Sequence, residues 1–203
     1  MSSKHNKNLY LYILSLIPII VTTPPYLGCC IIMILLLNFT MILGTTFRFF
    51  VNKINSGNTE KILTLALLIF ITIIFKRLLV LFSPVLGIML SFSIYFVPVS
   101  SLCLEHLYSK DDYSSSKVFG QNMKKSGLFS LYLFLFFLFR EIIAFGSISI
   151  PVVKGIKLLK FLPWSTNFWA TIPGTFIILG VILSLILVID KRFDVVRKSK
   201  KGV

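Results

Sequence analysis

The residues that could do chemistry in this chain are few, and two of them stand together inside an apolar run. Arg140 and Glu141 interrupt residues 127–148, most of which are apolar or aromatic. A run of this length and composition is typical of a membrane-spanning helix. Each charge near the middle of such a helix costs roughly 2.5–3.5 kcal/mol on insertion scales, so a charge that is kept there has partners inside the protein.

The spacing of this charged pair limits how its charges can be satisfied. Successive residues on a helix point about 100° apart, so Arg140 and Glu141 cannot satisfy each other. We therefore predict that at least one of them reaches another helix. The alternative is that the helix ends near Phe139 and both side chains lie at the membrane interface, where they extend towards the headgroups.

Three cysteines are the other candidates for chemistry: Cys29, Cys30 and Cys103. All three lie in or beside apolar stretches, and adjacent cysteines are not the pattern of a disulfide framework. One interpretation is that they are buried free thiols. The alternative is that one or more of them binds a metal as a thiolate.

Glycine and proline mark the places where apolar runs are interrupted: Gly28, Gly87, Pro98, Pro173 and Gly174. Short helices that end inside a membrane place their dipoles and terminal side chains near its midplane. The sequence has no Ser-His-Asp arrangement, nucleotide-binding loop or His-rich metal spacing. We therefore expect a functional centre formed at helix ends, in a chain that is not catalytic by itself.

Composition identifies the broad class of protein. The chain has 203 residues, of which 56% are hydrophobic, and its mean hydropathy is +0.91. Only 14% of the residues are charged, against about 25% in a typical soluble domain. The net charge of +14 comes from basic residues at the chain ends and in polar segments. We expect these residues to set orientation in a lipid bilayer, and we expect no nucleic-acid partner.

The apolar segments predict an all-α integral membrane protein with about six transmembrane helices. The predicted helical segments are 26–37, 39–54, 62–82, 85–104, 127–148 and 168–189, with a turn at Asn38. The alternative is one helix over 26–51, with residues 9–22 as a separate span. Polar loops are predicted at 52–61, 105–126 and 149–167.

The whole chain, residues 1–203, is interpreted as one membrane domain built from two repeats. Residues 25–28 (Pro-Tyr-Leu-Gly) and 84–87 (Pro-Val-Leu-Gly) each open an apolar run, which suggests repeats over about 24–82 and 84–190. Three crossings in each repeat would make it an inverted repeat of three plus three with short half-helices. The basic tail, 190–203, is expected in the cytoplasm, and an even number of crossings places the N-terminus there too.

Four motifs, in this order, resemble one family over residues 25–195: Leu27-Gly28-Cys29-Cys30, Leu86-Gly87-Ile88, Arg140-Glu141-Ile142-Ile143 and Ile172-Pro173-Gly174-Thr175-Phe176. The chain is similar to the small six-helix membrane subunits of the Rnf and Nqr ion-pumping electron-transport complexes, on the RnfE/NqrD side. The order and spacing of the motifs carry the resemblance, since no single motif is specific.

The resemblance implies a function, a cofactor and partners. In this family, two homologous subunits of opposite topology pair in the bacterial cytoplasmic (inner) membrane beside other subunits. Each contributes two cysteines to a shared iron–sulfur centre, which we expect to be a 2Fe–2S cluster. Electron transfer through the centre is coupled to Na⁺ or H⁺ movement. Cys30 takes the position of the first ligand.

The sequence departs from the family pattern at the second ligand. The family's second cysteine falls at about Val97-Pro98 here, and Cys103 lies five or six residues later. Either Cys103 replaces the missing ligand, with Cys29 as another candidate, or the chain keeps the fold without the metal. In the latter case the alternatives are a metal-free transporter and a structural assembly subunit in which Arg140-Glu141 locks helices together.

Overall fold

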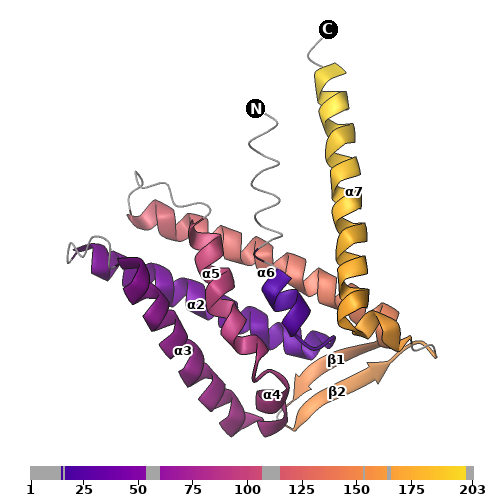
Figure 1. Ribbon diagram of the computed structural model, residues 1–203, viewed down its shortest axis with the longest axis horizontal. Helices are drawn as coiled ribbons and strands as arrows, with labels where there is room; N and C mark the ends of the chain where they lie inside the picture. The colour runs from indigo at the N-terminus through magenta and orange to yellow at the C-terminus, as the bar shows by residue number, and fades with distance from the viewer. Residues whose placement is uncertain are drawn as a thin grey trace.

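Helices make up most of the chain in the part that the structure describes (Figure 1). The computed structural model describes residues 15, 17–53, 60–106, 115–152, 154–163 and 166–199. Residues 17–22 are helical. The elements that follow are α2 (Leu27–Lys53), α3 (Glu60–Phe82), α4 (Pro84–Met89), η2 (Ser93–Tyr95), α5 (Phe96–His106), α6 (Ser115–Phe145), β1 (Ser147–Val152), β2 (Gly155–Lys160), η3 (Asn167–Ala170) and α7 (Ile172–Ser199).

Three of these helices are long and apolar enough to cross a membrane: Leu27–Val51, Ile62–Phe82 and Phe119–Phe145. Two shorter apolar helices, Ser93–Leu104 and Ile172–Ser184, accompany them. The chain is therefore a mostly helical, membrane-associated protein. The predicted count of six crossings stays a prediction. Part of segment 9–22, which the alternative prediction made a separate span, lies outside the described residues.

Asn38 does not break the first long helix, so the predicted turn there is wrong. Helix α2 runs through this position, close to the alternative prediction of one helix over 26–51. The Asn38 side chain donates to the carbonyl of Ile34 at 2.9 Å and to Ser130 Oγ at 2.9 Å. Its Oδ1 accepts from Ser126 Oγ at 2.6 Å. Because α2 and α6 satisfy its amide, Asn38 is accommodated within the helix.

The polar segment that precedes the third long helix is partly helical rather than a loop. Helix α6 begins at Ser115, inside the predicted loop 105–126, while residues 107–114 are not described. Asn122 is buried, and its Nδ2 donates to Thr45 Oγ1 of α2 at 3.4 Å. Polar contacts with α2 therefore extend this helix beyond its apolar part. Figure 1 shows α2 and α6 running side by side.

A two-stranded antiparallel hairpin replaces most of the predicted loop 149–167. Strands β1 and β2 pair with Ser147 opposite Lys160 and Ser149 opposite Leu158. The burial of Ser147 and Ser149, with Ile148 between them less buried, has the two-residue period of a strand. The prediction of an all-α fold is thus wrong in this segment, because the alternation is short and the prolines and lysines around it are typical of a loop.

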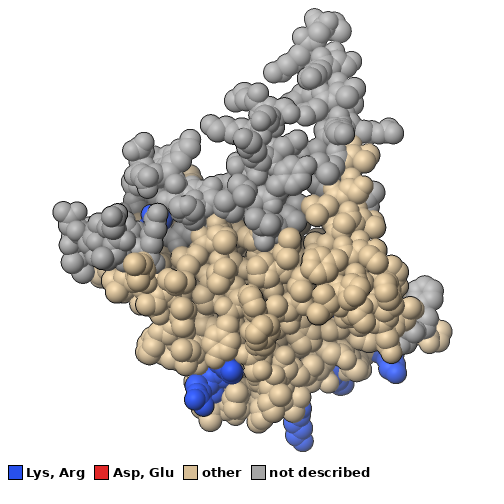
Figure 2. Space-filling view, in the orientation of Figure 1, with Lys and Arg blue, Asp and Glu red and all other residues tan. Residues whose placement is uncertain are grey.

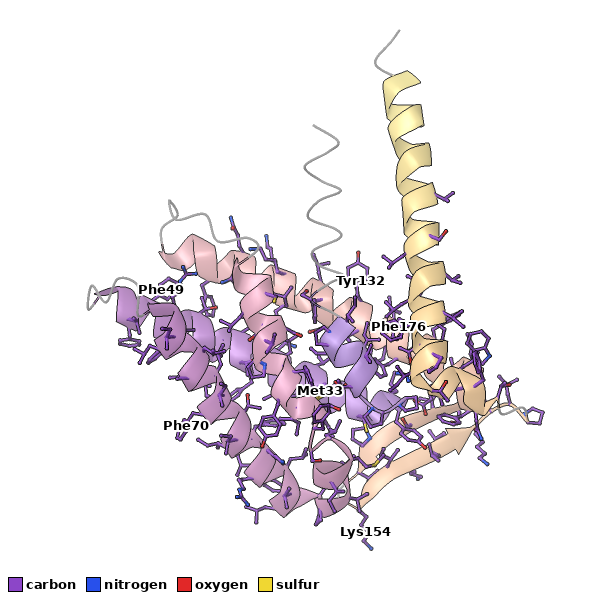
Figure 3. The ribbon with its side chains drawn as sticks, viewed as in Figure 1. Met33, Phe49, Phe70, Tyr132, Lys154 and Phe176 are labelled. Carbon is purple, nitrogen blue, oxygen red and sulfur yellow. The ribbon has the colours of Figure 1, made fainter. Side chains whose placement is uncertain are left out.

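The core lies between α2, α5, α6 and the short elements that join them. Met33 is fully buried near its centre (Figure 3), together with Leu36, Leu37 and Phe137. The outer side of α3 is apolar as well, and its Phe70 is 62% exposed. A surface of this composition suits the hydrocarbon of a bilayer and not water.

Charged side chains gather away from this apolar surface. In Figure 2 the Lys and Arg side chains lie mainly along the end of the molecule that carries α4 and the hairpin, and no described acidic side chain shows on this face. Lys154 marks this end in Figure 3. Helix α7 packs against the core near its start, where Ile178 and Leu179 are buried, and its later turns extend away from the other helices towards the opposite end (Figure 1).

The junction between α3 and α4 depends on Gly87. A Cβ atom at this position would lie 2.5 Å from Val80 Cγ2 and 3.1 Å from Val80 Cα. We predict that Gly87→Ala lowers the free energy of unfolding by about 1–3 kcal/mol, because overpacking forces the two helices apart. Thermal unfolding of the purified protein in detergent measures this effect.

A matched control and a rescue accompany this prediction. A Cβ atom on Gly127 in α6 would have no other atom within 4 Å, so Gly127→Ala should be neutral or stabilising by up to about 1 kcal/mol. Adding Val80→Ala to Gly87→Ala should recover part of the loss. Equal melting temperatures for the two alanine variants would show that the α3–α4 contact does not limit stability.

Candidate functional site

The candidate site is built around a break between two helices near the start of the described chain. Residues 17–22 are helical, residues 23–26 are not, and α2 begins at Leu27. Pro24 and Pro25 lie in the break, and proline has no N–H to continue a helix. The break therefore leaves carbonyls at the end of one helix and N–H groups at the start of the next, with partial negative and positive charge respectively.

Glu141 accepts a hydrogen bond from the backbone at the start of α2. Its side chain is only 1% exposed, and its Oε2 accepts from the Leu27 N–H at 2.6 Å and from Ser149 Oγ at 2.9 Å. Ser149 Oγ in turn accepts from the Gly28 N–H at 3.0 Å. A carboxyl oxygen at a helix N-terminus is placed favourably for both hydrogen bonding and the helix dipole. Residues from α6 and β1 thus cap α2.

Arg140 satisfies the carbonyls on the other side of the break. Its side chain is 2% exposed, and its Nη1 donates to the carbonyl of Ile20 at 3.3 Å. Its Nη2 donates to the carbonyl of Ala170 at 2.8 Å, and its Nε donates to that of Trp169 at 3.4 Å. The guanidinium therefore spreads its donors over the end of the 17–22 helix and over η3, where a positive charge is favourable.

The prediction that at least one of Arg140 and Glu141 reaches another helix is confirmed. Arg140 and Glu141 bind different elements, and both lie inside the protein. Helix α6 continues past them to Phe145. The alternative is wrong in ending the helix near Phe139 and in exposing both side chains, while the depth of the pair in a membrane stays a prediction. One dipeptide of opposite charges thus joins the two ends of a broken helix.

A second interrupted segment meets this break. Between Ser83 and α5 the chain forms only the six-residue α4 and the short η2. In η2, the buried Ser93 donates from its Oγ to the carbonyl of Thr22, the last residue of the 17–22 helix. This hydrogen bond joins the two interrupted segments inside the protein.

Two of the three cysteines lie at this meeting point. Cys29 and Cys30, in the first turn of α2, are fully buried free thiols in the same core cluster as Val97. Val97 is the approximate position at which the resemblance to the Rnf/Nqr subunits implies a second cysteine. Cys103 is also free, but it is exposed on α5. Cys30 and Val97 thus belong to the same buried core, whereas Cys103 lies outside it.

The donor set does not fit the complete ligand set that the resemblance implies. That set needs one thiolate from each repeat, and valine at position 97 has no donor atom. Among the residues described, no three His, Cys, Asp or Glu side chains lie together as a metal site. Cys30, with Cys29 beside it, is the contribution this chain can make from the buried cluster.

The glycines and prolines singled out from the sequence have different environments. A Cβ on Gly28 would lie 3.1 Å from the Pro151 nitrogen, so the start of α2 packs closely on β1. Pro98 is buried in the first turn of α5, where its missing N–H leaves no helix bond unmade. Pro173 is exposed near the start of α7, and Gly174 packs against the backbone of η3.

The serines and the backbone carbonyls of the site were not predicted from the sequence. Ser149 links Glu141 to α2, and Ser93 links the two interrupted segments. The signal present for Ser149 was the Ser-Ile-Ser-Ile alternation of residues 147–150. Carbonyl acceptors leave no trace in a sequence, since every residue has one. No protein-family model matches the chain, and no curated protein is significantly similar to it.

Proposed function

We propose that this chain is a membrane subunit of an ion-translocating electron-transport complex of the Rnf/Nqr type. It is not catalytic alone, and it pairs with a homologous subunit of opposite topology in the bacterial cytoplasmic membrane, with both termini in the cytoplasm. The observation that supports this proposal is the hydrogen bond between two interrupted helical segments, followed in the chain by Cys30 and Val97, which are both buried in the core. These are the approximate places at which the resemblance expects the two ligands.

In this proposal the buried charges hold the centre together. Glu141 caps the start of α2, which carries Cys30 in its first turn. Arg140 holds the 17–22 helix and η3 against the same point. A buried thiol gives up its proton when it binds a metal, and it then holds the metal as a thiolate. The chain would contribute Cys30 to a shared iron–sulfur centre, and the partner subunit would supply further ligands.

Iron analysis of the complex, purified through this chain, tests the proposal. We expect iron and a reduced-state EPR signal in the wild type, and we expect both to be lost in Cys30→Ser. Cys103→Ser is the matched control, because Cys103 is exposed and lies outside the cluster. It should keep its iron. An iron-free wild-type complex that is otherwise intact would contradict the proposal.

A second candidate is a subunit that keeps this fold without the metal, as a transporter or as a structural assembly subunit. Two observations favour it: valine occupies the approximate position of the second ligand, and Cys103 is exposed. In that case Cys30→Ser should leave assembly unchanged, whereas disrupting Arg140 should not. Substrate uptake by the chain alone in liposomes would separate a transporter from an assembly subunit.

A further inference from the structure

The two oxygens of the Glu141 carboxyl group have different surroundings. Oε2 accepts two hydrogen bonds, one from the Leu27 N–H and one from Ser149 Oγ. Oε1 is buried and has no hydrogen-bond partner among the described residues. The hydroxyl of Ser147, which is 1% exposed, also has no partner in that part of the chain. The Ser147 hydroxyl and the Ser149 N–H are both hydrogen-bonding neighbours of the same carboxyl group.

This pair of unpartnered atoms has a simple chemical explanation. An ionised carboxylate only accepts hydrogen bonds, whereas a protonated carboxyl group has an O–H that donates one. A buried polar atom without a partner costs about 1–3 kcal/mol. A proton on Oε1 that is donated to Ser147 Oγ would satisfy both atoms at once. Ser147 could serve the ionised form as well, because its hydroxyl can rotate and donate to Oε1.

We propose that Glu141 is a buried proton-binding site, with Ser147 as the partner of its Oε1 in both protonation states. In the neutral form Oε1–H donates to Ser147 Oγ; when the proton leaves, the Ser147 hydroxyl turns and donates to Oε1. Oε2 keeps its two donors throughout. The start of α2 therefore stays capped whether or not the proton is bound.

The charged and titratable groups around Glu141 are compatible with a proton on its carboxyl group. Arg140, the neighbour on α6, directs its donors to the carbonyls of Ile20, Trp169 and Ala170 and not to Glu141. From α2, the buried Cys29 thiol lies within Coulombic range of the carboxyl group. On the hairpin, Lys160 is opposite Ser147 but is exposed. The inference rests on these contacts and not on iron binding.

Infrared spectroscopy of the intact protein in lipid nanodiscs tests the site. We expect the wild type to show the C=O stretch of a protonated carboxylic acid, shifted to lower frequency in D₂O, and we expect Glu141→Gln to lack it. Raising the pH should replace this band by carboxylate bands. In Ser147→Ala the band should move to higher frequency, because the acid O–H loses its acceptor.

Ser100→Ala is the matched control, since Ser100 is also buried with a hydroxyl that has no partner in the described chain. It should leave the band unchanged. If Glu141→Gln fails to fold, the wild-type spectra in H₂O and D₂O and the Ser147→Ala shift still decide the question. Two outcomes would overturn the proposal: no protonated-acid band at any pH, or no shift in Ser147→Ala. Loss of the band on adding Na⁺ at constant ionic strength would support it, because the cation would then displace a proton that Glu141 had bound.

Discussion

Arg140→Gln should lower the thermal stability of the protein sharply and reduce the fraction recovered as a single species. The substitution removes the donors that satisfy the carbonyls of Ile20, Trp169 and Ala170. Each buried carbonyl that is left without a donor costs about 1–3 kcal/mol. The hydrogen bond to Ile20 is buried and the two to η3 are partly buried, so we expect a total loss of about 3 kcal/mol, which is large for a single substitution.

Arg77→Gln provides the matched control, because Arg77 is an exposed arginine in α3. A surface substitution of this kind usually changes stability by less than about 0.5 kcal/mol. Melting temperatures in the same detergent, together with size-exclusion profiles, make the comparison. If the two glutamine variants melt together, Arg140 does not hold the broken helix ends, and the site loses its structural basis.

Gly174→Ala should destabilise the protein by displacing the η3 carbonyls that Arg140 binds, although it changes no charged residue. A Cβ atom on Gly174 would clash with the carbonyl oxygen of Phe168 and lie 2.8 Å from Trp169 Cα. Both atoms belong to the backbone, so η3 itself must move. Overpacking of this kind costs about 1–3 kcal/mol. The movement also displaces the Trp169 and Ala170 carbonyls, which accept hydrogen bonds from Arg140.

Gly180→Ala is the control on the same helix, and it should have the opposite sign. No atom lies within 4 Å of a Cβ at Gly180, and alanine favours a helix over glycine by about 1 kcal/mol. Thermal unfolding should therefore rank the three proteins Gly180→Ala, wild type, Gly174→Ala. The double variant Arg140→Gln/Gly174→Ala should lose less stability than the sum of the losses in the two single variants, because both changes disrupt the same contact between Arg140 and η3. Full additivity would show that η3 and Arg140 act separately.

Apolar composition and the cost of charge in a membrane were enough to predict part of this structure. They predicted a membrane-associated helical protein, and they singled out Arg140 and Glu141 as residues that must find partners inside it. Both conclusions follow from solvation, which acts on each residue whatever its neighbours are. The interpretation of the three cysteines as buried thiols had the same basis; it is confirmed for Cys29 and Cys30 and wrong for Cys103, which is exposed.

The errors at Asn38 and at the hairpin have a different cause. Asn38 was interpreted as a turn because its amide is polar, but the serines of α6 satisfy it. Segment 149–167 was interpreted as a loop because of its prolines and lysines, but β1 is built against the start of α2. In both cases a residue far away in the chain supplies the hydrogen bond that decides the local conformation.

By itself, then, the sequence determined that this protein is membrane-associated and mainly helical. It also identified the two charged residues that need partners inside the protein. Only the tertiary structure decided which atoms pair with them. Glu141 meets an N–H 114 positions away, and Arg140 meets a carbonyl 120 positions away. The physical reason is that the cost of burying a charge depends on the residue itself and can be recognised in the sequence. The backbone groups that act as its partners lie at helix ends, and their positions depend on how the whole chain packs.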